Sequence, residues 1–293
     1  MLSRVLSYSG IFLLYLLSLL PLSLLYLLAD LCYYLLFYVI GYRRKVVRTN
    51  LLLAFPEKDS TAIHLIEKRF YKYLAALIVE IIKMATISPE EMKKRFAYKN
   101  IEQISSFLDR NESILICAGH YGNWEWGTLS IGLHLNITTC PIYKPLSNKV
   151  FDQWFYKIRS RFGNRMVAMR QTFRAISETK NEVTAFCFAS DQAPPKAESH
   201  EWITFLNQQT SVLFGIEKIA LKTNRPVFYF KVNVIKKGYY EVDIIPVTLD
   251  PKQTNGHEIT ELHIRLLEDD IKDDPAYWLW SHRRWKHQPT PLL

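Results

Sequence analysis

The stretch SILICAGHYGNWE, residues 113–125, decides the fold class of this chain and points to its chemistry. Residues 113–118 form an apolar, strand-like run, and residues 124–135 are typical of a helix. His120 therefore lies where a strand ends, and Glu125 lies in the first turn of the helix that follows. In open α/β sheets this edge is where ligands bind, so the stretch predicts a site there.

The spacing of His120 and Glu125 limits how the two could act together. A histidine can take a proton from a hydroxyl group, and a nearby carboxylate can fix its tautomer and stabilise the imidazolium. A five-residue step on a continuous helix turns by about 140°, so the side chains would diverge. Gly122 and Asn123 supply the needed break, because asparagine is a favoured N-cap. Taken alone, the pair is a weak signal, and a histidine at a strand end is often only a turn residue.

The chain beyond residue 96 alternates strand-like and helix-like segments. The expected strands are 113–118, 138–143, 165–169, 183–190, 227–234 and 240–247. The expected helices are 101–108, 124–135, 149–162, 172–180, 212–223 and 259–271. This order predicts an α/β fold with a mostly parallel central sheet flanked by helices. Residues 236–239 predict a hairpin that gives the sheet an antiparallel margin.

The N-terminal part of the chain is strongly apolar. Residues 10–29 contain no charged side chain, and twenty residues at the helical rise span about 30 Å, the thickness of a hydrocarbon core. A membrane helix is therefore favoured over a buried core helix, and the tyrosines and phenylalanine of 33–42 suit a membrane interface. Basic residues gather after this stretch, which predicts a downstream domain in the cytoplasm: Arg43, Arg44, Lys45 and Arg48, against Arg4 alone before it.

These features divide the chain into three parts. We expect an N-terminal transmembrane or interfacial helix over residues 1–42 and a helical, membrane-proximal segment over 43–95 that packs on the catalytic domain. The α/β domain is expected over 96–293.

Composition narrows the classes of partner and site. The formal net charge of +9 suits an anionic partner, and anionic lipid and nucleic acid both have that sign. The four cysteines lie in apolar runs without C-x-x-C spacing, which predicts reduced thiols. Because the H-E-x-x-H pattern is also absent, no metal is expected. No cofactor is expected either.

Further candidate residues lie at other strand ends. Lys144 follows one expected strand and could meet a phosphate or a developing oxyanion, although a solvated turn lysine is an equal alternative. Asp191 follows another and could orient an acceptor hydroxyl or pair with Lys144 or Arg170; otherwise it is a turn aspartate. The substrate-binding candidates are Lys144, Asn148, Asp191, Asn123 and Arg170.

Two aromatic stretches have open interpretations. Residues 202–210 could form a wall for an acyl chain or simply a strand. Residues 275–287 combine rings and cations, which could stack on nucleic-acid bases or lie at a membrane interface. The apolar N-terminus in the same chain favours the membrane and argues against nucleic acid as the partner.

An ordered set of motifs resembles the bacterial late acyltransferase family of lipid A biosynthesis, within the lysophospholipid acyltransferase superfamily. The resemblance extends over nearly the whole chain and departs from the family pattern at Lys144, where the family usually has arginine. The motifs are residues 120–125, 143–148 with Asp152, Asp191-Gln192, 278–286, the run from Arg43 to Leu51, and Phe55-Pro56-Glu57.

The resemblance implies transfer of a fatty acyl group from acyl carrier protein to a lipid hydroxyl at the cytoplasmic face of the inner membrane. By the same resemblance, His120 is the general base, Glu125 is its partner and a lipid A precursor is the first candidate acceptor. Another lipid acceptor, such as an aminolipid or a lysophospholipid, is the alternative within this chemistry. A covalent route through Cys117 is disfavoured, because a thiol within an apolar strand is normally inert. The alternative outside enzymology is a membrane-tethered lipid-binding protein with a degenerate site.

Overall fold

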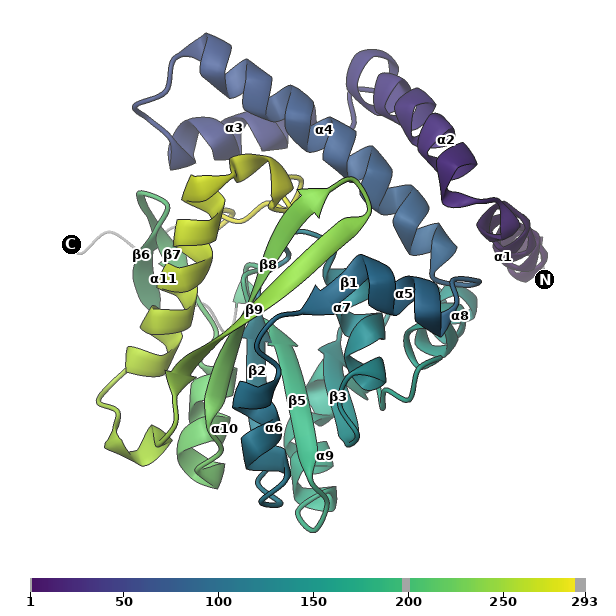
Figure 1. The fold of residues 1–293 in the computed structure, drawn as a ribbon. Coiled ribbons are helices and arrows are strands. Elements are labelled where there is room, and N and C mark those ends of the chain that lie inside the picture. Colours follow the sequence, from purple (N-terminus) through teal and green to yellow (C-terminus); the bar gives the residue numbers. More distant parts are fainter. Residues whose placement is uncertain (1, 197–200, 288–293) are drawn as a thin grey trace.

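The computed structural model describes residues 2–196 and 201–287 as an α/β fold built on one large sheet (Figure 1). The strands of that sheet lie in the order β1-β9-β8-β2-β5-β3-β4, and a separate small sheet pairs β6 with β7. Among the described strands of the large sheet, the pairing of β8 with β9 is antiparallel and all others are parallel. The predicted fold class, with its antiparallel hairpin at residues 236–239, is confirmed.

The element bounds follow from the backbone. The strands are β1 (Phe96–Tyr98), β2 (Ile114–Ala118), β3 (Thr138–Tyr143), β4 (Val167–Ala168), β5 (Thr184–Ala189), β6 (Trp202–Phe205), β7 (Gln208–Ser211), β8 (Val227–Lys236) and β9 (Tyr239–Thr248). The α-helices are α1 (Leu2–Leu19), α2 (Leu22–Tyr34), α3 (Arg44–Ala54), α4 (Ser60–Lys83), α5 (Pro89–Arg95), α6 (Glu102–Leu108), α7 (Trp124–Ser130), α8 (Lys149–Arg159), α9 (Thr172–Glu178), α10 (Gly215–Thr223) and α11 (Glu258–Asp273). A π-helical segment, η1 (Leu35–Val39), continues α2, and the 3-10 turns are η2 (Ile131–Leu133), η3 (Met169–Gln171), η5 (Pro251–Gln253) and η6 (Pro275–Tyr277).

Strand β2 is apolar at every position because both faces of the sheet are covered. Its side chains alternate between two hydrophobic clusters, Leu115 and Cys117 in one and Ile114 and Ile116 in the other. The first cluster includes apolar residues of α10 and α11, and the second includes those of α6 and α7. This two-sided burial fixes the strand that carries His120.

Several predicted boundaries move inward. The strand expected over 165–169 is reduced to β4, and the helix expected over 124–135 ends at Ser130 and continues as the turn η2. The short edge strand β1 is a new element, paired in parallel with β9. The segment 202–210 is a hairpin with Leu206 and Asn207 in its turn at φ of 49° and 63°.

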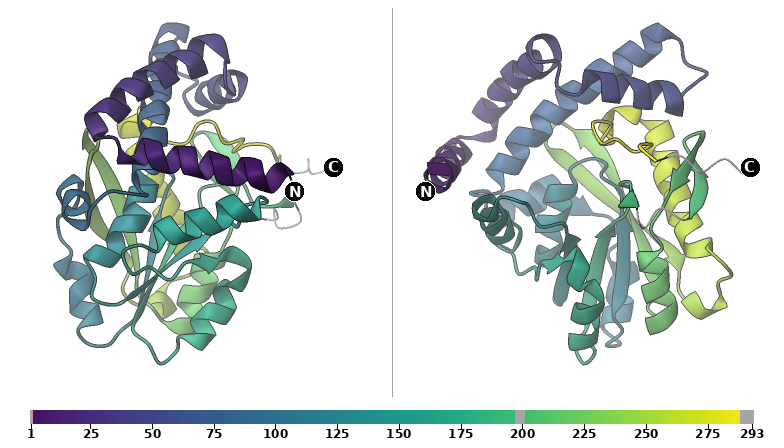
Figure 2. Two further views of the ribbon diagram at one scale, coloured as in Figure 1. Left: turned by 90° about the vertical axis from the view of Figure 1, so that its right-hand side faces the viewer. Right: turned by 180° about the vertical axis from the view of Figure 1, so that it is seen from behind.

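The prediction of one continuous helix over residues 10–29 is wrong. The structure breaks it at Pro21, which is the N-cap of α2, and α1 ends at Leu19. Proline has no backbone N–H and its ring clashes with the preceding turn of a helix, so a continuous helix through it is disfavoured. Figure 2 shows α1 and α2 running in different directions from this point.

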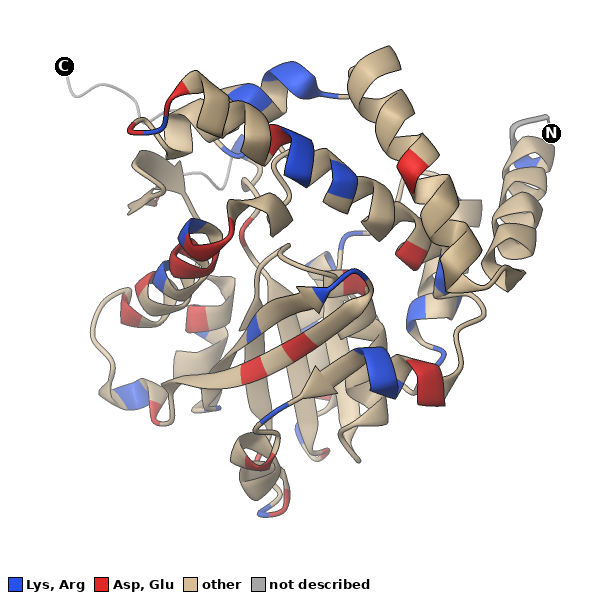
Figure 3. Ribbon diagram, turned by 45° about the horizontal axis from the view of Figure 1, so that its top comes forward, with Lys and Arg blue, Asp and Glu red and all other residues tan. Residues whose placement is uncertain are grey.

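The apolar N-terminal surface nevertheless has the properties of a membrane contact. The window Leu22–Val39 is long and apolar enough to cross a membrane, and only 22% of it is buried. Leucine and aromatic side chains stand exposed along α1 and α2, including Phe12, Leu27 and Tyr34. In Figure 3, α1 and α2 carry almost no charged residues, in contrast to α3 and α4. Exposed apolar patches of this kind mark interaction sites in water-soluble proteins.

The tryptophans of the run at 275–287 do not lie at a surface, which corrects the expectation of a membrane or base contact. Trp278, Trp280 and Trp285 are 2%, 0% and 9% exposed and belong to the core cluster of α11 and the β6–β7 hairpin. Asn50 of α3 donates to the carbonyls of Trp280 and His282 at 2.9 and 2.7 Å. The run is therefore a buried strap that holds helix α3 to the sheet domain.

Candidate active site

The register of β2 and β5 brings His120 and Asp191 together. The two strands pair in parallel with Ala118 opposite Ala189, and each functional residue follows two positions later. The Asp191 carboxylate accepts from the His120 backbone N–H at 3.0 Å and lies 2.5 Å from Nδ1 of the ring. Gly119 permits this turn, because a Cβ there would collide with Leu267 of α11.

The Asp191 carboxylate is held from a second direction. The indole Nε1–H of Trp278 donates to Oδ2 at 2.8 Å. The strap also pairs with the histidine loop through its backbone, since Leu279 N–H donates to the His120 carbonyl at 3.1 Å and Gly122 N–H donates to the Tyr277 carbonyl at 3.0 Å. Both the ring and its carboxylate are thus fixed by buried, satisfied groups.

This environment sets the charge of the pair. Burial by itself would lower the pKa of His120, but the Asp191 carboxylate outweighs burial and raises that pKa above its ordinary value. Burial by itself would raise the pKa of Asp191, but the imidazole and the Trp278 donor hold it well below the usual range. Asp191 is therefore ionised at neutral pH and accepts from an Nδ1–H, which leaves Nε2 of the neutral ring free of a proton.

Two neighbouring groups contact the ring. The Gln192 side-chain nitrogen lies 3.1 Å from Nε2, so its amide N–H donates to the basic nitrogen. The Trp124 ring packs edge-on against the imidazole at 5.2 Å between centroids. The nearby His263 and His282 do not resemble His120, because burial lowers the pKa of each to about 4.

Glu125 lies in the first turn of α7 as predicted, but its direct partner is a different residue from the expected one. Arg159 of α8 donates to both carboxylate oxygens, from Nε at 2.7 Å and from Nη2 at 2.5 Å. The contacts of His120 therefore assign the ring-orienting carboxylate to Asp191, whereas Glu125 holds the Arg159 guanidinium. Its negative charge still contributes to the raised pKa of His120, and the Arg159 charge opposes it.

Asn123 and Asn148 are helix caps. The Asn123 side chain accepts from Trp126 N–H at 2.9 Å, as the predicted N-cap of α7, and donates to the buried Glu80 at 2.6 Å. The Asn148 side chain accepts from Val150 and Phe151 at the start of α8 and donates to Ser7 at 2.9 Å. Their amides are thereby engaged in holding α7 and α8 in place.

Lys144 and Arg170 do not take part in the contacts of this cluster. Both are exposed, Lys144 in the segment before α8 and Arg170 in η3. Asp191 contacts neither of them among the described residues, so the expected pairing with these cations is wrong.

The structure also bears on other chemistry proposed from the sequence. Cys117 is fully buried, and burial raises its pKa well above the ordinary value, so the thiolate is disfavoured. All four cysteines are free thiols. Within residues 2–196 and 201–287 no cluster of three or more metal-ligating side chains forms.

Sequence reasoning gave no role in this site to Arg159, Trp278 or Gln192. Arg159 is the last residue of α8, and a buried carboxylate in need of a cation is the signal that could have indicated it. Trp278 and Gln192 belong to stretches noted in the sequence, but only the fold shows that one contacts the carboxylate and the other the imidazole.

Comparisons with known proteins agree with the resemblance seen in the sequence. A family model described as bacterial lipid A biosynthesis acyltransferase matches residues 1–287. The chain is similar to a lipid A biosynthesis palmitoleoyltransferase of Escherichia coli, with 21% identity over 258 residues that cover 85% of this chain and 80% of the relative. A lipid A biosynthesis acyltransferase of Shigella flexneri matches with the same identity and coverage. A second Shigella flexneri protein, lipid A biosynthesis acyltransferase 2, is 23% identical over 123 residues, or 42% of this chain and 39% of its own length.

Proposed function

Because the chain belongs to the bacterial lipid A biosynthesis acyltransferase family, and is therefore a lipid acyltransferase, we propose that it transfers a fatty acyl group from acyl carrier protein to a hydroxyl of a lipid A precursor. The observation that carries the proposal is the pair of the partly buried His120 and the buried Asp191 at the carboxyl ends of two parallel strands. The proposed location is the inner membrane, with the catalytic domain on the cytoplasmic side and no cofactor.

His120 acts as the general base through Nε2. It takes the proton of the acceptor hydroxyl as the hydroxyl oxygen attacks the thioester carbonyl carbon. Asp191 stabilises the imidazolium that forms and keeps the ring in the required tautomer. When the tetrahedral intermediate collapses, the carbon–sulfur bond breaks and the imidazolium protonates the leaving thiolate. The products are the new ester and the free thiol of the carrier.

Arg159 is assigned to the anionic oxygen that develops during attack. Its side chain is only 17% exposed, and the Glu125 carboxylate that it binds lies in the first turn of α7, directly after the His120 loop. Glu125 fixes that guanidinium through two hydrogen bonds, which supports a preorganised cation. In this proposal Glu125 acts by positioning Arg159, and Lys144 is left to contact the headgroup of the acceptor from an exposed turn.

Gln192 is assigned a role in the binding of the acceptor hydroxyl. Its amide donates to the nitrogen that must receive the proton, so the acceptor hydroxyl has to replace this hydrogen bond before attack. The amide is half-buried and can turn away without leaving a fully buried group unsatisfied.

The membrane part of the proposal rests on the apolar surface of α1 and α2. Their exposed leucines and aromatic rings provide a surface for lipid on the part of the chain that precedes the catalytic domain. Arg43 and Arg44 follow directly and lie on the cytoplasmic side by the positive-inside rule. A lipid acceptor could then reach the site from the bilayer while acyl carrier protein approaches from the water.

The proposal is tested by measuring acyl transfer with purified wild-type and His120→Ala protein in detergent. Each protein is given two acyl donors of one chain length, an acyl carrier protein thioester and a coenzyme A thioester. Wild-type protein is expected to add one acyl group to a lipid A precursor and to prefer the carrier-bound donor. The His120→Ala variant is expected to lose about 10²–10⁴-fold in rate. Acylation of a lysophospholipid and not of the lipid A precursor would show that the proposed acceptor is wrong. Full activity of the His120→Ala variant would show that His120 is not the general base.

A further inference from the structure

A cavity lies at the opposite end of the sheet from His120. Its volume is about 840 Å³, within the range of small-molecule sites. It opens where β2, β5 and β8 begin, between α9 and α10. Its lining includes Ser113, Phe173, Lys180, Lys222, Arg225 and Leu249.

The cavity is positively charged. Lys180, Lys222 and Arg225 line it, and among the described residues none of the three has a carboxylate within ion-pair distance. The acidic side chain in the lining is Glu112, whose two oxygens already accept from Arg110 at 2.9 and 3.3 Å. Three cations that share one cavity, while its lining carboxylate is already paired with Arg110, suit the recognition of a small anion.

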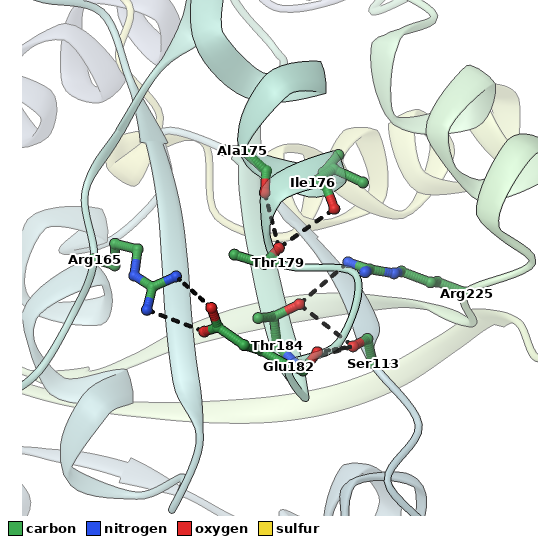
Figure 4. A network of polar contacts seen from close by, with 8 residues as sticks. All are labelled: Ser113, Arg165, Ala175, Ile176, Thr179, Glu182, Thr184 and Arg225. Atoms are coloured by element: carbon green, nitrogen blue, oxygen red, sulfur yellow. Dashed lines mark hydrogen bonds and ion pairs between the residues drawn. The ribbon is translucent and has the colours of Figure 1, made fainter.

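Arg225 is the anchor of this site. Its side chain is inside the protein, with 9% of the residue exposed, and burial lowers the pKa of its guanidinium. One nitrogen donates to the Thr184 hydroxyl at 3.2 Å, and the guanidinium lies over the Phe186 ring at 5.6 Å. Figure 4 shows Arg225 directed at Thr184 and Ser113, while Arg165 on the other side of β5 pairs with Glu182. A buried guanidinium bound to a single neutral hydroxyl still has donors for an anion.

We propose that this cavity binds a water-soluble phosphate monoester, with the phosphate on Arg225, Lys180 and Lys222. A planar guanidinium and two ammonium groups match the oxygens of a phosphate dianion. The organic group of the ester lies against Phe173 and Leu249, which are 56% and 54% exposed at the same cavity. A bare inorganic anion would leave these two apolar walls in water.

The position of the cavity separates it from the acyl-transfer reaction and from the membrane. In Figure 1 the helices α1 and α2 lie at one end of the molecule, whereas α9 and α10 lie at the other. A lipid headgroup in a bilayer that holds α1 and α2 would not reach α9. The thioester of the acyl donor must reach His120, at the far ends of β2 and β5. The ligand is therefore a third molecule, distinct from donor and acceptor.

The site also has a structural route to the catalytic pair. Ser113 precedes β2 and Thr184 begins β5, and Thr184 N–H donates to the Ser113 hydroxyl at 3.0 Å. The same two strands end next to His120 and Asp191. A ligand held by Arg225 therefore stabilises the ends of the two strands that carry the reaction.

Isothermal titration calorimetry of the full chain in detergent micelles tests the proposal with phenyl phosphate, inorganic phosphate and dihexanoyl phosphatidic acid. Phenyl phosphate is expected to bind saturably at one site and about tenfold more tightly than inorganic phosphate. Arg225→Gln, and separately the double variant Lys180→Ala with Lys222→Ala, are expected to weaken its binding about tenfold or more. Arg165→Gln is the matched control, because Arg165 is a neighbouring arginine outside the cavity lining, and its affinity is expected to stay within about twofold of wild type.

Absence of saturable binding by phenyl phosphate would overturn the proposal. Unchanged affinity in the double lysine variant would also overturn it, and this variant changes no buried side chain. A tighter response to dihexanoyl phosphatidic acid than to phenyl phosphate would overturn the assignment to a soluble ester. Melting temperatures of the unliganded variants show which have folded, so a misfolded Arg225→Gln protein leaves the decision to the lysine variant.

Discussion

The Asp191→Asn variant probes the catalytic pair most selectively. The carboxylate accepts three hydrogen bonds, one oxygen facing Nδ1 of His120 and the other facing the His120 and Trp278 N–H groups. An asparagine must place an NH₂ group at one of these positions. Facing the two N–H donors it would leave both unsatisfied, so the NH₂ group is expected to face Nδ1.

That arrangement moves the proton of the imidazole. An NH₂ donor opposite Nδ1 requires Nδ1 to accept, and the neutral ring then carries its hydrogen on Nε2. The nitrogen assigned as the base is thereby protonated in the neutral ring. The variant also lacks the charge that stabilises the imidazolium. In serine-protease triads the corresponding substitution lowers the rate about 10⁴-fold, and we expect a loss of about 10³–10⁴-fold in kcat with little change in KM.

The assay is acyl transfer from the acyl carrier protein thioester to the purified lipid acceptor, followed by mass spectrometry. Asp59→Asn is the control, since Asp59 caps α4 through Ala62 N–H and asparagine caps about as well. Retention of more than about a fifth of wild-type kcat in a folded Asp191→Asn protein would refute the reasoning.

The same variant makes a prediction about pH. The pKa of His120 is raised in the folded protein, so the ion pair stabilises the fold fully below the unfolded value of about 6.5 and this contribution is lost as pH rises through the raised value. Catalysis needs the neutral ring, so kcat/KM rises through that same raised pKa. Without the Asp191 charge the pKa falls, and the acidic limb of the kcat/KM profile is expected to move to lower pH. An unmoved limb would contradict the assigned cause of the shift.

Three further substitutions test other parts of the site. Glu125→Gln removes the carboxylate from a largely buried guanidinium, so the unfolding free energy measured by chemical denaturation should fall by about 2–3 kcal/mol, and an unchanged value would exclude the pair as a structural element. Trp278→Phe keeps a buried aromatic ring but removes the N–H donor to Asp191. Acyl transfer should therefore slow about tenfold, and the free energy of unfolding should fall by about 1 kcal/mol. A wild-type rate would show that this donor is dispensable. Cys117→Ala removes a buried thiol of raised pKa and should leave the rate within about threefold of wild type, whereas loss of activity in a folded variant would restore the covalent route.

Local patterns in the sequence account for the sheet and for the position of the base. The apolar run 113–118 predicted the strand β2, and Asn123 predicted the start of α7. The strand-end locations of His120 and Asp191 followed from the same patterns. Their pairing did not, because it depends on which strands are neighbours, and strand order is a long-range property.

The partner of Glu125 and the burial of the C-terminal aromatic run could be identified only from the tertiary structure. Arg159 reaches Glu125 because α8 packs beside α7, a contact without a signature in either helix. Trp278 and Trp280 resemble interfacial residues by composition, but helix α3 and the β6–β7 hairpin bury them. The break at Pro21 was available in the sequence, since proline disfavours a continuous helix, and the length of the uncharged run obscured it.

The central claim is that His120 transfers an acyl group to a lipid A precursor. Lipid mass spectrometry of cells that produce the wild-type chain or its His120→Ala variant at equal levels tests it most directly. We predict that the wild-type chain adds the mass of one acyl group to a lipid A species and that the variant leaves that species unmodified. An unchanged lipid profile with the wild-type chain, or the same added mass with the variant, would contradict the claim.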